Sequence, residues 1–201
     1  MSIATYSDLK TAVTNWTKRD DLTSYLDDII LTAEQWIYRN VRAREMETAL
    51  SITTTTGSVA PLPSDFLLAK TVIYTTGGEN RNLTLKTPAW LRTKFLINDG
   101  ACPEFFAIEG SNMLFGPGIA SGITITGTYY KDLGSVASSA HALFVAHPDL
   151  YLWASLAEAS LFLKNPTQGS LWTAKRDQIK NDVNGISNSA RSADGMAVSA
   201  G

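Results

Sequence analysis

The sequence predicts an α+β fold, in which helices from both ends of the chain form a bundle and a small antiparallel β unit is inserted between them. Apolar residues recur at helical spacing within residues 6–41 and again within residues 147–186. Residues 45–131 are instead rich in β-branched residues, which alternate with polar ones between glycine-containing turns. Residues 187–201 are small and polar without periodicity. We therefore expect one domain over residues 1–186, followed by an extended C-terminal tail.

Two helices are expected before residue 42. The first covers residues 8–17, where Ser7 can cap the helix by accepting a hydrogen bond from a free backbone N–H. The second runs from about residue 24 to residue 40, with aspartates in its first turn and arginines near its end, as the helix dipole favours. Its apolar stripe consists of Leu26, Ile29, Ile30, Ala33, Ile37 and Val41.

The middle of the chain predicts short strands joined by tight turns. The dipeptides Gly57-Ser58 and Gly77-Gly78 mark two of these turns. A short helix is expected at residues 88–98, because Thr87 followed by Pro88 is a favourable helix start. The expected strands cover residues 48–56, 70–76, 82–86, 104–108, 112–115 and 123–130.

Two helices are expected after the β unit. Pro148 opens a strongly apolar helix that runs to about residue 164, and Asn165-Pro166 ends it. The last helix includes Trp172 and is expected to fray near Gly185. Together with the first two helices, this pair supplies the predicted bundle.

Glu158 is a carboxylate within the apolar C-terminal helix. A carboxylate left unpaired in a protein core is strongly destabilising, so it must have a cation or a partner protein beside it. Three arginines at the end of the second helix could supply that cation, and we expect a structural ion pair between Glu158 and Arg39, Arg42 or Arg44. This interpretation is favoured over a catalytic acid, because no base or nucleophile accompanies Glu158 in the sequence.

The composition excludes several classes of protein. Of the 201 residues only 18% are charged, and the 17 basic residues against 19 acidic ones give a net charge of -2. A protein that grips nucleic acid usually carries a cationic surface, which this balance does not supply. The aromatic content of 9% argues against intrinsic disorder for most of the chain. No apolar run approaches the roughly 20 residues that span a bilayer, and no signal peptide is expected.

The motifs for catalysis or cofactor binding are incomplete. The glycine-containing segment 116–121 leads into a strand rather than a helix, so it lacks the helix terminus of a dinucleotide site. Cys102 is the single cysteine and cannot form an internal disulfide or a multi-thiolate metal site. His141 and His147 have Asp149 as the nearby candidate for a third metal ligand, and we expect them to be a turn residue and a residue at a helix start instead. No catalytic residue, cofactor or metal is predicted.

Short motifs spread along most of the chain carry a resemblance to a known family. They are Tyr6-Ser7-Asp8-Leu9-Lys10, residues 16–22 (WTKRDDL), Ala33-Glu34 before residues 39–46 (RNVRAREM), Leu62-Pro63-Ser64-Asp65-Phe66, residues 148–152 (PDLYL), residues 156–159 (LAEA) and Trp172. In this order they resemble the head-to-tail adaptor, or connector, proteins of short-tailed and related bacteriophages. Each motif is weak alone, and their order carries the resemblance.

The resemblance implies a structural virion protein without enzymatic activity. Such a protein forms a homo-oligomeric ring, typically a dodecamer, at the head–tail junction of the capsid vertex. It binds the portal protein on one side and tail nozzle or tail fibre proteins on the other, and double-stranded DNA passes through its lumen during ejection. The C-terminal segment reaches toward the portal, with Arg191, Met196 and Val198 as its sizeable anchors. The protein is made in the host cytoplasm and has no membrane partner.

Three alternatives stay open at this point. The first is another collar or tail component with a similar mixture of helices and strands. The second is a small ligand-binding module that uses exposed aromatic residues such as Phe106, Tyr129 and Tyr130. The third is a small hydrolase, which is the weakest because no nucleophile–base pair has supporting context.

Overall fold

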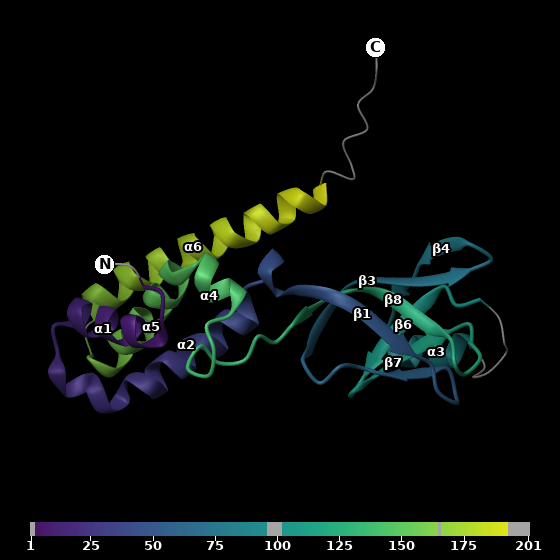
Figure 1. The fold of residues 1–201 in the computed structure, drawn as a ribbon, viewed down its shortest axis with the longest axis horizontal. Coiled ribbons are helices and arrows are strands. Elements are labelled where there is room, and N and C mark those ends of the chain that lie inside the picture. The colour runs from purple at the N-terminus through teal and green to yellow at the C-terminus, as the bar shows by residue number, and fades with distance from the viewer. Residues whose placement is uncertain (1–2, 96–101, 165, 193–201) are drawn as a thin grey trace, which may run out of the picture. The chain divides into compact units, whose positions relative to one another are not determined.

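The computed structural model describes residues 3–95, 102–164 and 166–192, without the side chains of Asp20 and of residues 188–192. The chain divides into two compact units. A helical unit comprises Met1–Met46 and Leu133–Gly201, and a β unit comprises Glu47–Asp132 (Figure 1). Helices therefore come from both ends of the chain and two small sheets from its middle, which confirms the predicted α+β fold class.

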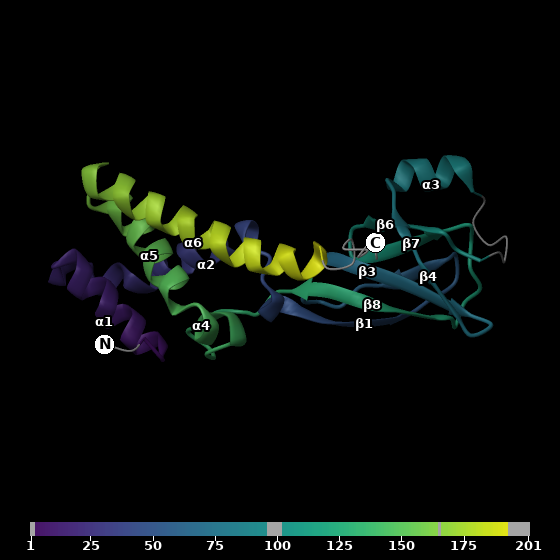
Figure 2. The same ribbon diagram turned by 90° about the horizontal axis from the view of Figure 1, so that it is seen from above.

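In the helical unit, one helix is buried on nearly every side. α5 (Pro148–Phe162) is apolar around its whole circumference, as expected for a central helix. It packs against α1 (Tyr6–Thr17), α2 (Leu26–Asn40) and α6 (Pro166–Ser192), and the short α4 (Ala142–Ala146) precedes it (Figure 2). Two 3-10 segments, Asp20–Tyr25 and Arg44–Met46, flank α2. The second predicted helix is confirmed, including its end at Asn40.

The first helix starts earlier than the sequence predicted. Thr5, not Ser7, is its N-cap: the Thr5 hydroxyl accepts from the Asp8 N–H at 3.2 Å, and the Asp8 carboxylate accepts from the Thr5 N–H at 3.0 Å. This reciprocal capping box satisfies two backbone donors, whereas Ser7 as a cap would have no acidic partner three residues later. The predicted cap at Ser7 is therefore wrong by two residues.

The last helix continues beyond its predicted end. It frays neither at Gly185 nor at Ile186 but runs to Ser192, so the predicted tail 187–201 begins with helical residues. Contacts with the segment after α2 explain the extension. The Asn184 side chain accepts from the Arg42 N–H at 2.8 Å, and the Ser187 hydroxyl accepts from the Arg44 N–H at 3.1 Å. Residues 193–201 lie outside the described residues.

The β unit contains two four-stranded sheets. The first has the order β1-β8-β3-β4, formed by Glu47–Thr53, Thr124–Lys131, Phe66–Thr76 and Glu79–Asn82. The second has the order β2-β7-β6-β5, formed by Val59–Pro61, Asn112–Gly116, Phe105–Glu109 and Thr84–Leu85. All pairs are antiparallel except β5 with β6, which is parallel. The predicted antiparallel unit is thus correct apart from this one strand.

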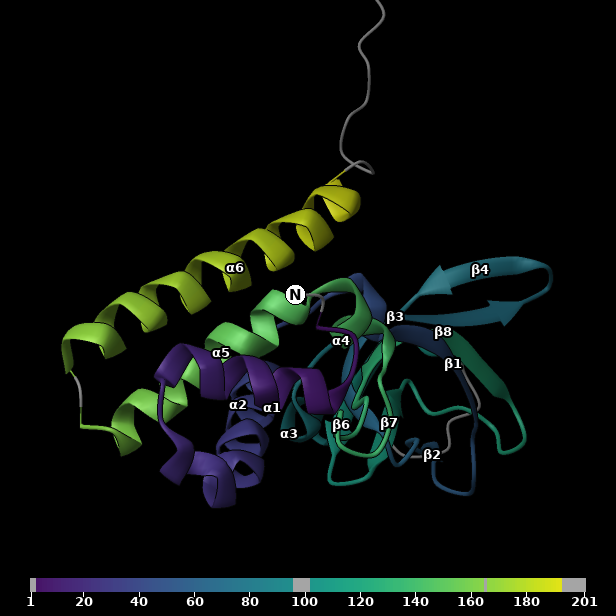
Figure 3. The same ribbon diagram turned by 60° about the vertical axis from the view of Figure 1, so that its left-hand side comes forward.

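The predicted return strand at residues 82–86 divides between the two sheets. β4 forms a hairpin with β3 across Gly77-Gly78, as Figure 3 shows, and then β5 joins the other sheet. The Leu83 N–H bonds to the Val72 carbonyl at 2.8 Å and its side chain is buried. One buried leucine therefore marks where the chain crosses from sheet to sheet.

The two sheets enclose a common apolar core. Its members are Leu50, Ile52, Ala60, Val72, Tyr74, Leu83, Phe106, Met113, Phe115, Ile119, Ile125 and Tyr129. Phe106, Tyr129 and Tyr130 are all buried, so the prediction that these aromatic residues are exposed for ligand binding is wrong. Phe106 and Tyr129 belong to this common core. Tyr130, the next residue in β8, is on the opposite face of the strand, where it is also buried and its hydroxyl donates to the Glu47 carboxylate at 3.2 Å.

The short helix in the β unit is α3 (Pro88–Lys94). The Thr87 hydroxyl accepts from the Trp90 N–H at 3.3 Å, which confirms the predicted start. The helix ends four residues before the predicted residue 98, and residues 96–101 lie outside the described residues. Trp90 and Phe95 pack their rings against Phe105 of β6, which fixes α3 to the second sheet.

Candidate interaction surfaces and the contacts behind them

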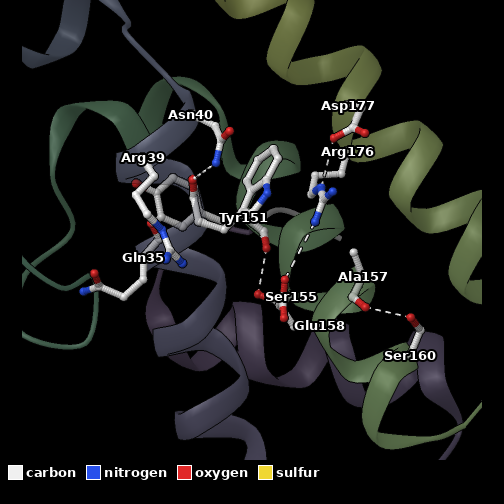
Figure 4. A network of polar contacts seen from close by, with 11 residues as sticks. Gln35, Arg39, Asn40, Tyr151, Ser155, Ala157, Glu158, Ser160, Arg176 and Asp177 are labelled. Carbon is white, nitrogen blue, oxygen red and sulfur yellow. Dashed lines mark hydrogen bonds and ion pairs between the residues drawn. The ribbon is translucent and has the colours of Figure 1, made fainter.

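Glu158 forms its ion pair with Arg176 of α6 (Figure 4). The closest atoms, Oε1 of Glu158 and Nη1 of Arg176, are 3.7 Å apart, and the side chains are only 18% and 13% exposed. The Arg176 guanidinium also lies 3.9 Å from the centre of the Trp36 ring on α2. One arginine therefore joins α2, α5 and α6 through an ion pair and a cation–π contact.

The three arginines expected to pair with Glu158 have other partners. Arg39 Nε donates to the Gln35 carbonyl at 2.9 Å, and Arg42 Nη1 donates to the carbonyls of Tyr38 and Val41 at 2.7 and 2.6 Å. Arg44 lies 3.7 Å from the Glu45 carboxylate. Arg42 thus satisfies carbonyls at the C-terminal end of α2, a common role for cations at helix ends. The ion pair of Glu158 is present, but its predicted partners are wrong.

The sequence contained a signal for Arg176. Trp172, Arg176, Ile179 and Val183 are spaced by four, three and four residues, so Arg176 lies on the apolar stripe of α6. Trp172, Ile179 and Val183 are all buried in the structure. A cation on such a stripe faces the neighbouring helix, where Glu158 of α5 supplies a carboxylate.

A second buried carboxylate, Glu34, lies in the middle of the α2 stripe. It is 1% exposed, and its Oε1 accepts from the Val136 N–H at 2.8 Å. The Tyr38 hydroxyl, one turn later, donates to the Gly134 carbonyl. These bonds fasten the segment that follows the β unit onto α2. Glu34 lies between Ile30 and Ile37 at helical spacing, so the argument used for Glu158 could also have identified it.

His141 completes this polar cluster. Its Nε2 lies 3.2 Å from the Tyr38 hydroxyl and 3.3 Å from the Tyr151 hydroxyl. Burial, together with Tyr38 and Glu34 nearby, raises the pKa of Tyr151 above its usual range. Tyr151 therefore stays a neutral phenol near neutral pH. The hydrogen-bonded cluster joins α2, α4 and α5.

Both histidines stand at helix boundaries, as predicted. His141 is the N-cap of α4, where Nδ1 accepts from the Phe144 N–H at 3.4 Å, and His147 lies between α4 and α5. His147 Nε2 is 3.9 Å from Glu45. Within residues 3–95, 102–164 and 166–192, no three His, Cys, Asp or Glu side chains are grouped to hold a metal ion. In the same residues no helix is long and apolar enough to cross a membrane.

Large apolar side chains are exposed at several places on the helical unit. They are Trp16, Tyr25, Leu31, Val145, Leu161, Phe162, Leu171 and Ile186. Leu161 at the end of α5 is 74% exposed and borders a groove of about 330 Å³ with Gly169 and Ser170 of α6. Tyr25 and Phe162 pack their rings 4.9 Å apart at the same end of α5.

The predicted portal anchors fall largely outside the described residues. Met196 and Val198 lie beyond Ser192, and Arg191 belongs to α6 although its side chain is not described. Their role as portal anchors therefore stays a prediction.

Comparison with known protein families gives a match that covers nearly the whole chain. The model of the SU10 adaptor protein family matches residues 4–199. The comparison with curated proteins gave no match. A match of this extent confirms the resemblance to phage head-to-tail adaptors and supports a structural, connecting role. The chain belongs to the SU10 adaptor protein family, whose members are phage adaptor proteins.

Proposed function

We propose that this protein forms a ring that joins the portal at the capsid vertex to the tail and lets double-stranded DNA pass through its lumen. The family match over residues 4–199 is the observation that carries the proposal. The proposed ring contains twelve copies, and its partners are the portal protein on one side and tail nozzle or fibre proteins on the other. The proposed location is the head–tail junction of the virion, and no enzymatic activity is assigned.

The exposed apolar residues of the helical unit are the proposed contacts between neighbouring copies. Leu161 on α5 and Leu171 on α6 are 74% and 66% exposed, the highest exposures among the large apolar side chains of these two helices. In a ring these side chains would be covered by the next copy, which would remove their apolar surface from water. The C-terminal residues Met196 and Val198 stay the proposed contacts with the portal.

The test is sedimentation of the purified chain with portal rings. We expect the wild-type chain to sediment with the portal in an equimolar complex. Leu161→Asp and Leu171→Asp should reduce the bound amount at least tenfold, because each places a charge on the proposed contact between copies. Gln178→Asp, an exposed change on α6 that removes no apolar contact, is the matched control and should bind like the wild type.

Two outcomes would contradict the proposal. One is wild-type chain that does not sediment with portal rings at micromolar concentration. The other is equal loss of binding for Gln178→Asp and the two leucine variants, since binding would then depend on net charge and not on apolar contacts. Monomers in the absence of portal agree with the proposal, because such a ring can assemble on its partner.

A further inference from the structure

The second sheet of the β unit ends in an open strand edge. β5 is the outermost strand of the order β2-β7-β6-β5. The Thr84 N–H donates to the Glu104 carbonyl at 2.9 Å, and the Lys86 N–H donates to the Phe106 carbonyl at 2.8 Å. Peptide groups of consecutive strand residues point to opposite sides, so the N–H and C=O of Leu85 point away from β6. The edge therefore offers one donor and one acceptor to an added strand.

An apolar groove of about 610 Å³ follows this edge. It is lined by Leu85, Lys86, Thr87, Pro88, Trp90 and Ile108. Leu85 is 54% exposed and Trp90 is 38% exposed, which is unusual for large apolar side chains beside a core. The groove lies where the side chains of an added strand would lie.

The two faces of the β5 edge differ in chemistry. Leu85 pairs in register with Phe106, so its side chain is on the face of the sheet that also carries Ile108. Lys86 is on the opposite face, where its Nζ lies 5.5 Å from the centre of the Trp90 ring and 5.7 Å from that of Phe105. One face therefore carries Leu85, Phe106 and Ile108, and the other carries aromatic rings with a cation.

Lys86 has no carboxylate partner among the described residues. The neighbouring cation Arg92 on α3 is instead paired with Glu109. The aromatic rings hold the Lys86 ammonium at the groove, and its charge is available for an anionic group. Charge complementarity thus selects an acidic side chain on this face of an added strand.

We propose that the β5 edge binds an extended segment of a partner protein in which an apolar and an acidic residue are neighbours. The segment adds a strand to the sheet through the peptide groups of Leu85. Neighbouring side chains of the segment then lie on opposite faces of the sheet. The apolar side chain contacts Leu85 and Ile108, and the acidic side chain contacts Lys86. Strand addition with different side-chain contacts on the two faces gives both binding and sequence preference. This surface goes beyond the proposed ring and requires no portal.

The experiment measures binding of ten-residue peptides to the purified full chain by fluorescence anisotropy. One peptide alternates leucine and aspartate, a second alternates leucine and lysine, and a third has the leucines and aspartates in two blocks. We expect the alternating acidic peptide to bind at least tenfold more tightly than the other two. Lys86→Glu should reverse the preference toward the lysine peptide. Lys94→Glu changes an exposed lysine on α3 outside the groove and should keep the wild-type preference.

Leu85→Pro tests the strand addition itself. It removes the outward N–H and keeps the donors of Thr84 and Lys86 that hold β5 to β6, so the acidic peptide should bind at least tenfold more weakly. If this variant unfolds, Lys86→Glu still tests the proposal, because Lys86 forms no ion pair within the part of the chain that the structure describes. Equal binding of acidic and lysine peptides, or no binding of either, would overturn the proposal.

Two further outcomes separate this proposal from others. Self-association of the chain that Leu85→Pro abolishes, without peptide binding, would overturn it in favour of a second copy at the edge. Failure of the sedimentation test with portal would leave the peptide result intact, since the peptide assay contains the adaptor chain alone. The two proposals therefore fail independently.

Discussion

Gly127 lies in the centre of β8, where the backbone of β3 approaches too closely for any side chain. A Cβ atom on Gly127 would lie 2.1 Å from the Thr71 carbonyl oxygen and 3.1 Å from Val72 Cα. The obstacle is backbone, which cannot move as a flexible side chain can. A register shift in the β3–β8 pairing between Ala69 and Thr71 lies at the same place. The glycine is thus required by the close approach of two strands.

Gly127→Ala is therefore expected to lower the free energy of unfolding by about 2–3 kcal/mol. Gly185→Ala is the matched control, because a Cβ on this helical glycine meets nothing within 4 Å. The control should raise the free energy of unfolding by about 0.5–1 kcal/mol through helix propensity. Urea unfolding followed by circular dichroism measures both, and a destabilisation by Gly185→Ala as large as that by Gly127→Ala would contradict the account.

Arg176 combines an ion pair with Glu158 and a cation–π contact with Trp36, and all three side chains come from different helices. Arg176→Met keeps much of the volume and removes the charge. We expect a loss of about 1–3 kcal/mol in the free energy of unfolding, because Glu158 is left with 18% exposure and no cation. Arg19→Met breaks the exposed pair with Asp21 and should leave stability essentially unchanged. Equal effects of the two substitutions in chemical unfolding would show that burial does not matter here.

Tyr129 makes the stability of the β unit depend on pH in the alkaline range. Burial, and the hydrogen bond to Asp65 at 2.8 Å, raise the pKa of Tyr129 to about 12 from the ordinary value of 10. The folded state thus favours the protonated phenol, and its contribution to stability is complete below pH 10 and is lost as the pH rises toward 12. Ultraviolet titration of wild type minus Tyr129→Phe should give a midpoint near 12. A midpoint near 10 would show that Tyr129 is not buried and bonded as described.

Helices and strands differed in how far the sequence could predict them. Local signals such as Pro88 after Thr87, and the acidic first turn of α2, act within a few residues and were sufficient for those helices. The continuation of α6 depends on Asn184 and Ser187 bonding to the segment after α2, which lies more than 140 residues away in sequence. The parallel strand β5 depends in the same way on pairing with β6. Periodicity does not encode such tertiary bonds.

Two deletions at the C-terminal end of the chain distinguish an effect on stability from an effect on the proposed portal binding. Deletion of residues 193–201 leaves every described residue in place, so the free energy of unfolding should not change. Deletion of residues 187–201 also removes the Ser187 hydroxyl that accepts from the Arg44 N–H, which should cost about 1 kcal/mol or more. Both deletions remove Met196 and Val198 and should weaken portal binding equally. Portal binding at wild-type affinity by the shorter deletion would contradict the proposed role of the tail.

Across the whole molecule, low charge and exposed apolar groups fit a protein that is mostly covered by other proteins. The net charge of -2 over 201 residues would give a ring of many copies only a weak negative potential, so DNA phosphates would be repelled mildly and would not bind. The composition by itself excluded a DNA-gripping protein but could not identify the adaptor family. The order of motifs along the chain did so, and the family match over residues 4–199 confirms it.

Electron microscopy of negatively stained portal rings mixed with the purified chain tests the central proposal most directly. The account predicts a second ring on one face of each portal, with the symmetry of twelve copies and density for the helical unit repeated around the axis. The deletion of residues 193–201 in the same preparation should reduce the fraction of portals that carry this collar. Bare portals beside free monomers, at concentrations of the chain well above those of the portal, would contradict the account.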